Sequence, residues 1–262
     1  MSFNYEVILC SCNGSKYITE QLESILNQVI LPCRFILSDD GSTDNTVSKV
    51  RNFISSYQSI ELIIVEGPQK GPSINFLNSL KYSKLDYVFF SDQDDVWESD
   101  KIEKYIKAIH KFSKNSPQLY YSDALLVDEF LNSKNITHLQ YLKVRPQINR
   151  NHLIIFCNYV QGATICLNSN LVELINEQIK ETGFRDIVIH DWWCALLANY
   201  FGDLIFIDEP LIKYRQHPNN LIGLGNKFVF FDKVRSTLLM IKQGFKVLSI
   251  INKKILNKTR NQ

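Results

Sequence analysis

The stretch "RFILSDDGSTDNT", residues 34–46, passes directly from an apolar segment into a loop of acids, glycine and hydroxyl residues. A second stretch, "DYVFFSDQDDVW" at residues 86–97, repeats this arrangement later in the chain. In an open parallel sheet, the loops at the carboxyl ends of the strands gather at one edge, and ligands bind there beside helix N-termini. Two acidic loops at two strand ends therefore predict one ligand site rich in oxygen atoms.

The segments around these two loops alternate between strand and helix patterns. Short runs rich in β-branched and aromatic residues predict strands at 6–12, 34–38, 61–65 and 86–91. Apolar residues at helical spacing predict helices at 18–29, from 42 to about 54, 71–83 and 99–112. The last of these has Asp100 three residues before Glu103, which is the spacing of a capping box. This alternation is typical of an α/β fold, a mainly parallel sheet with helices on both faces.

The second half of the chain has a mixed pattern. Strand-like segments occur at 119–127, 152–158 and 160–167, followed by helical patterns at about 169–180 and 191–201. Two further short strands are expected at 204–208 and 211–216. No repeat or low-complexity linker divides the chain, so we expect one compact body.

The charge of the chain is balanced overall and uneven along its length. The 262 residues carry 29 basic and 27 acidic side chains, a net charge of +2, which argues against a nucleic-acid-binding protein. Residues 225–262 hold nine basic residues and one acidic residue. Apolar residues recur among these lysines at helical spacing, so this segment either contacts an anionic membrane surface or packs on the body with its basic face in solvent.

The six cysteines include no CxxC pair, and several lie in apolar runs where cysteine acts as a small hydrophobic residue. The N-terminal sequence shows no secretory signal, and no apolar run reaches the roughly 20 residues of a membrane span. These observations favour a cytoplasmic protein.

The acidic loops contain five carboxylates that need a partner, namely Asp39, Asp40, Asp92, Asp94 and Asp95. A carboxylate repels a phosphate, so these groups either accept hydrogen bonds from a ligand or hold a cation. A nucleotide satisfies both uses, because its base and ribose carry donors and its diphosphate is commonly bound through Mg²⁺ or Mn²⁺.

Five motifs in order resemble those of family 2 glycosyltransferases with the GT-A fold. They are "CNGSKYITEQLESILNQ" (12–28), "SDDGSTDNT" (38–46), the DXD-type "SDQDDVW" (91–97), "HDWW" (190–193) and "YRQHPNN" (214–220). The resemblance covers about residues 5–223. It implies a GT-A domain over 1–223, with a nucleotide-sugar half at about 1–117 and an acceptor half at about 118–223. The basic helical segment 224–262 would follow it.

The resemblance also implies roles for single residues in donor binding. Asp39 or Asp40 would contact the nucleotide base, with Asn13 in the same pocket, and Asp92 would meet the ribose. Asp94 would bind the divalent metal, Mn²⁺ or Mg²⁺, on the diphosphate. Arg215 would bind the nucleotide sugar, and His217 would approach the metal or the phosphates.

On the acceptor side, the resemblance implies that Asp191 is the catalytic base of an inverting reaction. A helix cap is the competing interpretation of this residue. The family often has an acid where this chain has His190, and a tyrosine in place of Cys12. The side chains assigned to the acceptor are Asp95, Trp97, Gln161 and Trp192. Asp95 also remains a candidate nucleophile, should the reaction be a double displacement.

The motif set most resembles the rhamnosyltransferase-like branch, which implies transfer from dTDP-rhamnose to a bacterial lipopolysaccharide or capsule, with a lipid-linked glycan as acceptor. A UDP-hexose or UDP-N-acetylhexosamine donor is the alternative. Two other classes remain open: a sugar nucleotidyltransferase, which should have a basic glycine-rich phosphate loop after the first strand, and a non-catalytic nucleotide-sugar binding module.

Overall fold

The computed structural model describes residues 3–146, 152–155, 157–185, 187, 189–218, 220 and 249. Its strands are β1 Tyr5–Ser11, β2 Arg34–Asp39, β3 Glu61–Glu66, β4 Tyr87–Ser91, β5 Val96–Trp97, β6 Gln118–Val127, β7 Ser133–Thr137, β8 Cys166–Asn168 and β9 Asp203–Arg215. Its α-helices are α1 Ile18–Leu26, α2 Thr46–Ile54, α3 Pro72–Ser79, α4 Lys101–Ile109, α5 His138–Leu142, α6 Ser169–Thr182 and α7 His190–Phe201. Three short 3₁₀ turns are η1 Leu80–Tyr82, η2 His152–Ile155 and η3 Gly162–Thr164.

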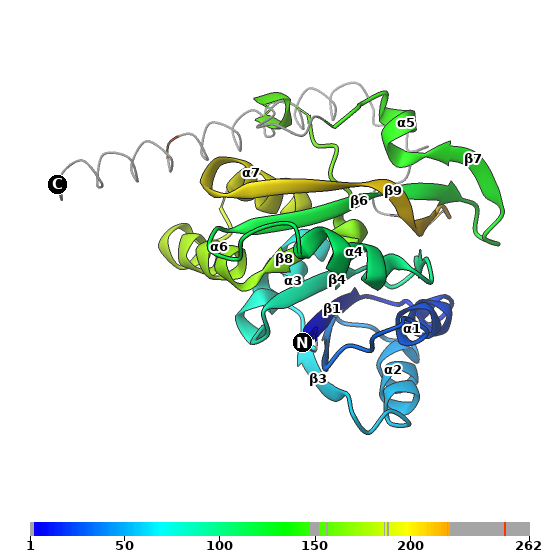
Figure 1. Ribbon diagram of the computed structural model, residues 1–262. Helices are drawn as coiled ribbons and strands as arrows, with labels where there is room; N and C mark the ends of the chain where they lie inside the picture. Colours follow the sequence, from blue (N-terminus) through cyan, green and yellow to red (C-terminus); the bar gives the residue numbers. More distant parts are fainter. Residues whose placement is uncertain are drawn as a thin grey trace, which may run out of the picture.

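All nine strands of the described residues form one sheet, in the order β3-β2-β1-β4-β8-β6-β9-β5, with β7 beside β6 (Figure 1). The first four strands, β3, β2, β1 and β4, are parallel, as the sequence predicted. The second part is mixed: β8 is antiparallel to both β4 and β6, whereas β9 runs parallel to β6. The predicted α/β fold with a mixed second half is therefore confirmed.

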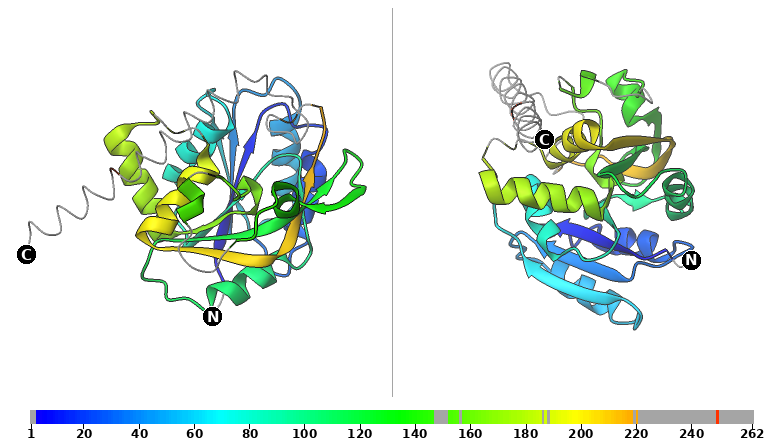
Figure 2. Two further views of the ribbon diagram at one scale, coloured as in Figure 1. Left: turned by 90° about the horizontal axis from the view of Figure 1, so that it is seen from above. Right: turned by 60° about the vertical axis from the view of Figure 1, so that its left-hand side comes forward.

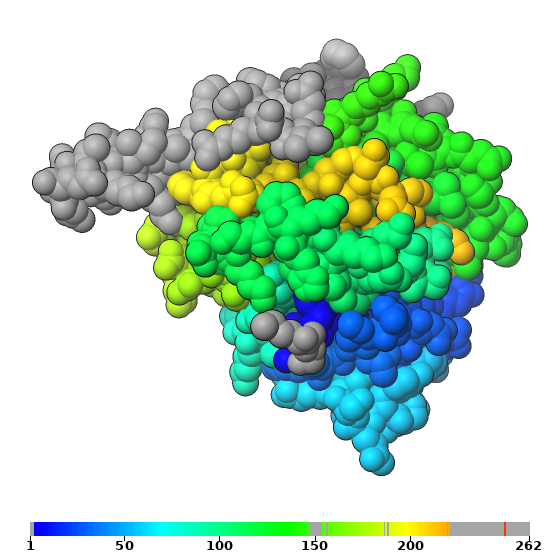
Figure 3. All heavy atoms as spheres, in the orientation of Figure 1, coloured from blue at the N-terminus to red at the C-terminus, as the bar shows by residue number. Residues whose placement is uncertain are grey.

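Side chains alternate between the two faces along each strand, and helices cover both faces (Figure 2). In β1, Val7 and Leu9 pack with α1, α2 and α4, while Ile8 and Cys10 pack with α3, α6 and α7. Figure 3 shows the first part of the chain, in blue and cyan, against the later part in green and yellow. Among the described helices, none is both long and apolar enough to cross a membrane.

Three local expectations were wrong. The strand expected at 152–158 is instead the short turn η2 over its first residues. The two strands expected at 204–208 and 211–216 are one strand, β9. Its pairing with β6 shifts between Ser122 and Asp123, so a bulge before Pro210 lets the strand continue past a residue that lacks an N–H.

The predicted capping box of α4 was also wrong. Asp100 does precede the helix, but its side chain makes no capping hydrogen bond, and Glu103 pairs with Lys107 instead. All six cysteines are unpaired. The predicted basic segment 224–262 lies outside the described residues apart from Ser249, and the domain boundaries remain a prediction.

Candidate active site

The carboxyl ends of β1, β2 and β4 lie side by side at one edge of the sheet. Ser11 pairs with Asp39 at the end of β2, and Leu9 pairs with Ser91 at the end of β4. β2 and β4 flank β1 on opposite sides, so the strand order reverses at β1. Open α/β sheets bind ligands at this kind of reversal, and both acidic loops of the sequence meet here.

The first acidic loop uses its carboxylates to hold the chain together. Asp39 accepts hydrogen bonds from Ser11 Oγ at 2.6 Å, from Ser42 Oγ at 2.6 Å and from the Ser42 N–H at 2.8 Å. Asp40 accepts from the N–H groups of Gln69 at 2.5 Å and Gly71 at 3.0 Å. Both carboxylates therefore fix neighbouring loops.

Asn13 joins this loop from the end of β1. Its backbone has the left-handed φ of 51°, and its N–H donates to Ser42 Oγ at 2.8 Å. Its side-chain oxygen accepts from the Thr43 N–H at 2.8 Å. The three residues predicted for the base pocket, Asn13, Asp39 and Asp40, are thus brought together, as parts of one hydrogen-bonded loop pair.

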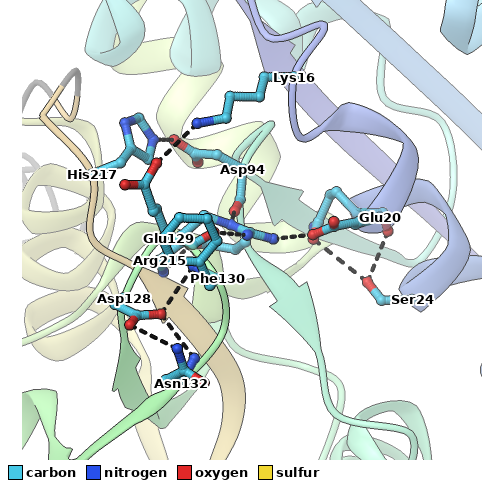
Figure 4. A network of polar contacts seen from close by, with 12 residues as sticks. Lys16, Glu20, Ser24, Asp94, Asp128, Glu129, Phe130, Asn132, Arg215 and His217 are labelled. Carbon is cyan, nitrogen blue, oxygen red and sulfur yellow. Dashed lines mark hydrogen bonds and ion pairs between the residues drawn. The ribbon is translucent and has the colours of Figure 1, made fainter.

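The second acidic loop, residues 92–95, faces the segment that follows β9 (Figure 4). Asp94 Oδ2 lies 2.8 Å from His217 Nε2. The backbone carbonyl of Asp94 accepts from Arg215 Nε at 2.7 Å, and Asp95 Oδ1 accepts from the Arg215 N–H at 3.0 Å. Two motifs separated by more than a hundred residues therefore build one part of the site.

The carboxylates of this second loop are crowded together in a partly buried position. Burial raises the pKa of Asp92 to about 7, and the negative charges of Asp94 and Asp191 add to the effect. Burial, then Asp94 and Asp92, also raise the pKa of Asp95 well above its usual range. A bound cation would relieve this repulsion.

Lys101 is the basic residue that acts on Asp95. It is fully buried, and its Nζ donates to the Ala163 carbonyl at 3.0 Å. Burial lowers its pKa to about 7, so its compensating charge is weak near neutral pH. Asp95 Oδ2 is buried and has no hydrogen-bond partner within the described part of the chain.

Asp191 is the second residue of α7, which places it inside the first helical turn. The helix cap is Ile189, so the alternative prediction that Asp191 caps this helix is wrong. Its carboxylate accepts from Asn158 Nδ2 at 2.9 Å and from the Trp192 N–H at 2.5 Å. Burial raises its pKa to about 7, although these hydrogen bonds oppose the shift. Asp191 lies close enough to Asp92 for its charge to help raise the pKa of that residue.

His190 is buried beside Asp191 and stacks on Phe76, with ring centroids 4.4 Å apart. Burial lowers its pKa to about 3, so the ring is neutral at physiological pH. A Cβ atom at Gly162 would lie only 2.8 Å from His190 Nε2, so glycine is required for this close packing. Asp191 is therefore the ionisable acid of this motif.

Three residues that the sequence assigned to ligands are placed in the protein interior. Arg215 is 1% exposed and its guanidinium donates to protein atoms. Trp192 is fully buried, with its Nε1 donating to the Ile154 carbonyl. Trp97 is 3% exposed, with Lys101 Nζ 3.8 Å from its ring centroid. In this structure neither tryptophan offers an open ring face to a sugar.

The remaining residues assigned to the acceptor, Asp95 and Gln161, are also buried, at 0% and 9% exposure. Gln161 Oε1 has no hydrogen-bond partner among the described residues. Gln161 adjoins Gly162 and so lies beside His190 and Asp191. With Trp192, whose N–H donates to Asp191, it is a member of the acceptor set that lies next to the catalytic candidate.

Several residues that shape the site were missed. Gln93 bridges to Cys12, its amide pairing with both the N–H and the carbonyl of that residue at 2.9 and 3.1 Å. Asn158 holds Asp191, and Glu129 joins the site from the turn after β6. Gln93 lies inside the motif already singled out, whereas Asn158 and Glu129 lie in segments with no motif to draw attention to them.

A divalent cation, implied by the resemblance, fits the pair Asp94 and His217. Mg²⁺ is usually bound by one or two carboxylates, with substrate phosphates and waters completing its coordination. In the part of the chain that the structure describes, no three His, Cys, Asp or Glu side chains are grouped to hold a metal by themselves. The Asp94 and His217 side chains are 15% and 8% exposed and face each other beside uncompensated carboxylates. This matches a site in which the protein supplies two ligands and a diphosphate supplies the others.

Comparison with solved structures shows a shared fold. The S. aureus TarS fragment 1–349 in complex with UDP-GlcNAc aligns with a TM-score of 0.64 and 16% identity, over 95% of this chain and 71% of that one. A mannosyltransferase of Pyrobaculum calidifontis in complex with GDP-Man and Mn²⁺ aligns with a TM-score of 0.58 and 16% identity, over 82% of this chain and 58% of that one. The architecture is that of the GT-A fold.

Sequence comparison identifies the family. The dTDP-rhamnosyl transferase RfbG of Shigella flexneri is 32% identical over 228 residues, which cover 84% of this chain and 75% of that protein. The UDP-Glc:alpha-D-GlcNAc-diphosphoundecaprenol beta-1,3-glucosyltransferase WfgD of Escherichia coli is 29% identical over 141 residues, 52% of this chain and 54% of that protein. The family model described as glycosyl transferase family 2 matches residues 6–161. The chain belongs to glycosyl transferase family 2.

Proposed function

We propose that this protein transfers a sugar from a nucleoside-diphosphate donor to a bacterial surface glycan, with inversion at the anomeric carbon. The observation that supports this most directly is the meeting of Asp191 with the residues 92–95 at the strand-end site. One motif supplies a carboxylate suited to proton transfer, and the other supplies carboxylates suited to a cation and a diphosphate.

In this reaction Asp191 takes the proton from the acceptor hydroxyl as that oxygen attacks the sugar. A general base works best when its pKa lies near the working pH, and burial has raised the pKa of Asp191 to about 7. Asn158 orients the carboxylate by donating to Oδ1. A single base on the acceptor side is what one in-line displacement with inversion requires.

Asp94 and His217 would hold the divalent cation, Mn²⁺ or Mg²⁺. When bound, such an ion supplies a positive charge that stabilises the departing diphosphate. Asp92 and Asp95 have raised pKa values because the protein does not stabilise their ionised forms. A cation bound at this loop would favour those ionised forms, which supports this role.

The nucleotide would lie over the ends of β1 and β2. Asp92 would accept from the ribose hydroxyls, and Asn13, Asp39 and Asp40 would line the base pocket. Each carboxylate oxygen has two acceptor sites, so Asp40, with one hydrogen bond to each oxygen, keeps capacity for a donor on the base. Arg215 is not included, because its guanidinium already binds three protein atoms.

dTDP-rhamnose is the donor we propose first, because RfbG, described as a dTDP-rhamnosyl transferase, is similar over most of this chain. A UDP-hexose is the second candidate, because WfgD is described as using UDP-Glc. The name of WfgD also includes a diphosphoundecaprenol acceptor, which supports a lipid-linked glycan as acceptor here. Contact with a membrane through residues 224–262 remains a prediction, since that segment lies outside the described residues apart from Ser249.

The two other classes considered make different predictions. A sugar nucleotidyltransferase would release pyrophosphate from a nucleoside triphosphate. A binding module would bind the nucleotide sugar without turnover, and loss of Asp191 would leave it unaffected. The family membership and the placement of Asp191 favour the glycosyltransferase.

The experiment is a calorimetric titration of the protein with dTDP, UDP and GDP, each with and without Mn²⁺. We expect one pyrimidine diphosphate to bind, and to bind more tightly with the metal. Release of that diphosphate from dTDP-rhamnose or UDP-glucose, in the presence of a lipid-linked glycan, then identifies the donor. A folded sample that binds none of the three diphosphates would overturn the proposal.

A further inference from the structure

Arg215, at the end of β9, is a buried cation whose every side-chain nitrogen has a protein partner. Nε donates to the Asp94 carbonyl at 2.7 Å and one terminal nitrogen donates to the Glu129 carbonyl at 2.6 Å. The other terminal nitrogen pairs with the Glu20 carboxylate. Its own N–H donates to Asp95 Oδ1 at 3.0 Å. Each of the three guanidinium nitrogens therefore has a protein partner.

The partners of Arg215 come from three separate segments (Figure 4). Glu20 lies in the first turn of α1, Asp94 lies in the loop after β4, and Glu129 lies in the turn after β6. That turn is itself firmly built, because Asp128 Oδ1 accepts from the N–H groups of Phe130 and Asn132, both at 2.9 Å. Arg215 therefore connects the loop at residues 92–95 to α1 and to the turn after β6.

The aromatic ring of Tyr17 adds a layer to this arrangement. Arg215 Cζ lies 4.5 Å from the centroid of this ring, and the His217 ring centroid lies 4.9 Å from it. Tyr17 directly precedes α1 and is 9% exposed. Both His217 and Arg215 thus pack against one side chain at the start of α1.

The choice of acceptor on Asp94 has a chemical consequence. Arg215 binds the backbone carbonyl of Asp94 and leaves its carboxylate directed at His217. A guanidinium on the carboxylate would neutralise the charge that a cation needs. Bound to the carbonyl, it fixes the position of Asp94 and preserves that charge.

We propose that Arg215, held by Glu20, is a positioning residue that sets the geometry of the Asp94 and His217 pair for the metal and diphosphate. This inference rests on the proposed function, and it assigns a role to Glu20, to which the motif at residues 12–28 gave none. Within the described part of the chain, Glu20 makes no hydrogen bond or ion pair with Asp94, His217 or the acceptor candidates, so we expect its effect on donor binding to pass through Arg215.

The test compares two glutamates in equivalent positions. Glu20 is the third residue of α1 and Glu103 is the third residue of α4. Each pairs with one basic side chain, and each has a side chain 51% exposed. Glu20→Gln and Glu103→Gln therefore remove the same charge from the same helical position, but only Glu20 is linked to Arg215.

We expect Glu20→Gln to weaken Mn²⁺-dependent binding of the nucleoside diphosphate by about three- to tenfold, a shift of the size of one lost charge-assisted contact. The donor KM should rise by a similar factor while kcat changes less, because Asp191 is untouched. Glu103→Gln should leave both quantities at the wild-type value. Arg215→Lys, which keeps the charge and loses the fork, should show a larger effect in the same direction.

Equal diphosphate binding by Glu20→Gln and Glu103→Gln, with wild-type binding intact, would overturn the positioning role and leave the proposed function standing. A fall in the melting temperature of Glu20→Gln without a change in binding would also overturn it, since that result indicates a merely structural contact. Absence of Mn²⁺-dependent diphosphate binding by the wild-type protein would instead overturn both proposals. If Arg215→Lys does not fold, the matched glutamate pair still decides.

Discussion

The two acidic loops look alike in the sequence and differ in their electrostatics. In the first, Asp39 and Asp40 accept five hydrogen bonds from hydroxyl and backbone N–H groups of the surrounding loops. In the second, Asp92 and Asp95 have raised pKa values because burial and neighbouring carboxylates oppose their charge. The protein stabilises the ionised carboxylates of the first loop with hydrogen bonds, whereas the ionised forms of Asp92 and Asp95 in the second loop are disfavoured until a cation binds.

This difference shows how the same residue type can serve structure at one strand end and ligand binding at the next. Carboxylates that accept several hydrogen bonds are stable in place and make a rigid pocket wall. Carboxylates that face each other are costly without a cation, and such pairs are a common property of functional sites. The reactive part of this site is located by the carboxyl groups with raised pKa values, more than by the number of acids.

The largest effect is expected from Asp191→Asn, which removes the proposed base near the second acidic loop. Turnover should fall by about 10²- to 10⁴-fold, the usual contribution of a general base. Diphosphate binding should stay within about twofold, a difference small on the scale of binding free energies. Steady-state kinetics and calorimetry measure the two quantities. Turnover near the wild-type level would rule out Asp191 as the base.

The next effect is expected from Asp94→Asn, which removes the carboxylate that faces His217. We expect turnover to fall by about 10²-fold or more, as when other electrostatic stabilisers of a leaving group are lost, and the response to added Mn²⁺ to disappear. The control is wild-type protein treated with EDTA, which should lose activity and recover it on addition of Mn²⁺. Full activity of the wild-type protein in EDTA would contradict the metal role.

The smallest effect concerns stability and tests the comparison itself. Asp39→Asn should lower the free energy of unfolding by about 1–3 kcal/mol, because buried donors lose a charged acceptor. Asp92→Asn should instead raise the melting temperature at pH 8. The pKa of Asp92 is raised from 3.8 to about 7, so the folded protein keeps that proton longer than the unfolded chain. Stability therefore falls as the pH rises between these values, and the variant escapes this loss.

Thermal unfolding of both variants at pH 5 and pH 8, without ligand, checks this prediction. At pH 5 Asp92 is largely protonated in the folded protein, so Asp92→Asn should differ little from wild type there. If Asp92→Asn destabilises at pH 8 as much as Asp39→Asn, the two loops do not differ in the way the contacts indicate.

Much of the fold was predictable because its signals are local. The strands β1 to β4 and the helices α1 to α4 follow from apolar periodicity, and their bounds match the expectations within a few residues. The failures lie in the second half, where β9 continues through Pro210 by means of a bulge, and where β7 and α5 have weak patterns. For β7 and β9, pairing with β6 decided the structure over local preference.

The sequence predicted which residues lie in the candidate site better than it predicted what each of them contacts. Asp94, His217 and Asp191 came from motifs, and the structure places Asp94 against His217 and Asp191 near Asp92. The family resemblance assigned Arg215 to nucleotide-sugar binding. Its burial and its partners could not be foreseen, because they belong to segments far apart in the chain.

The sequence by itself determined the alternation of strands and helices, the two acidic strand ends and the family, because periodicity and motifs are properties of neighbouring residues. Only the tertiary structure decided which carboxylates accept hydrogen bonds from the protein and which lie close to other carboxylates. It also decided that Trp97, Trp192 and Arg215 lie inside. The reason is physical: burial, pKa and hydrogen-bond partners depend on contacts between residues that are distant in sequence, and these contacts exist only once the chain has folded.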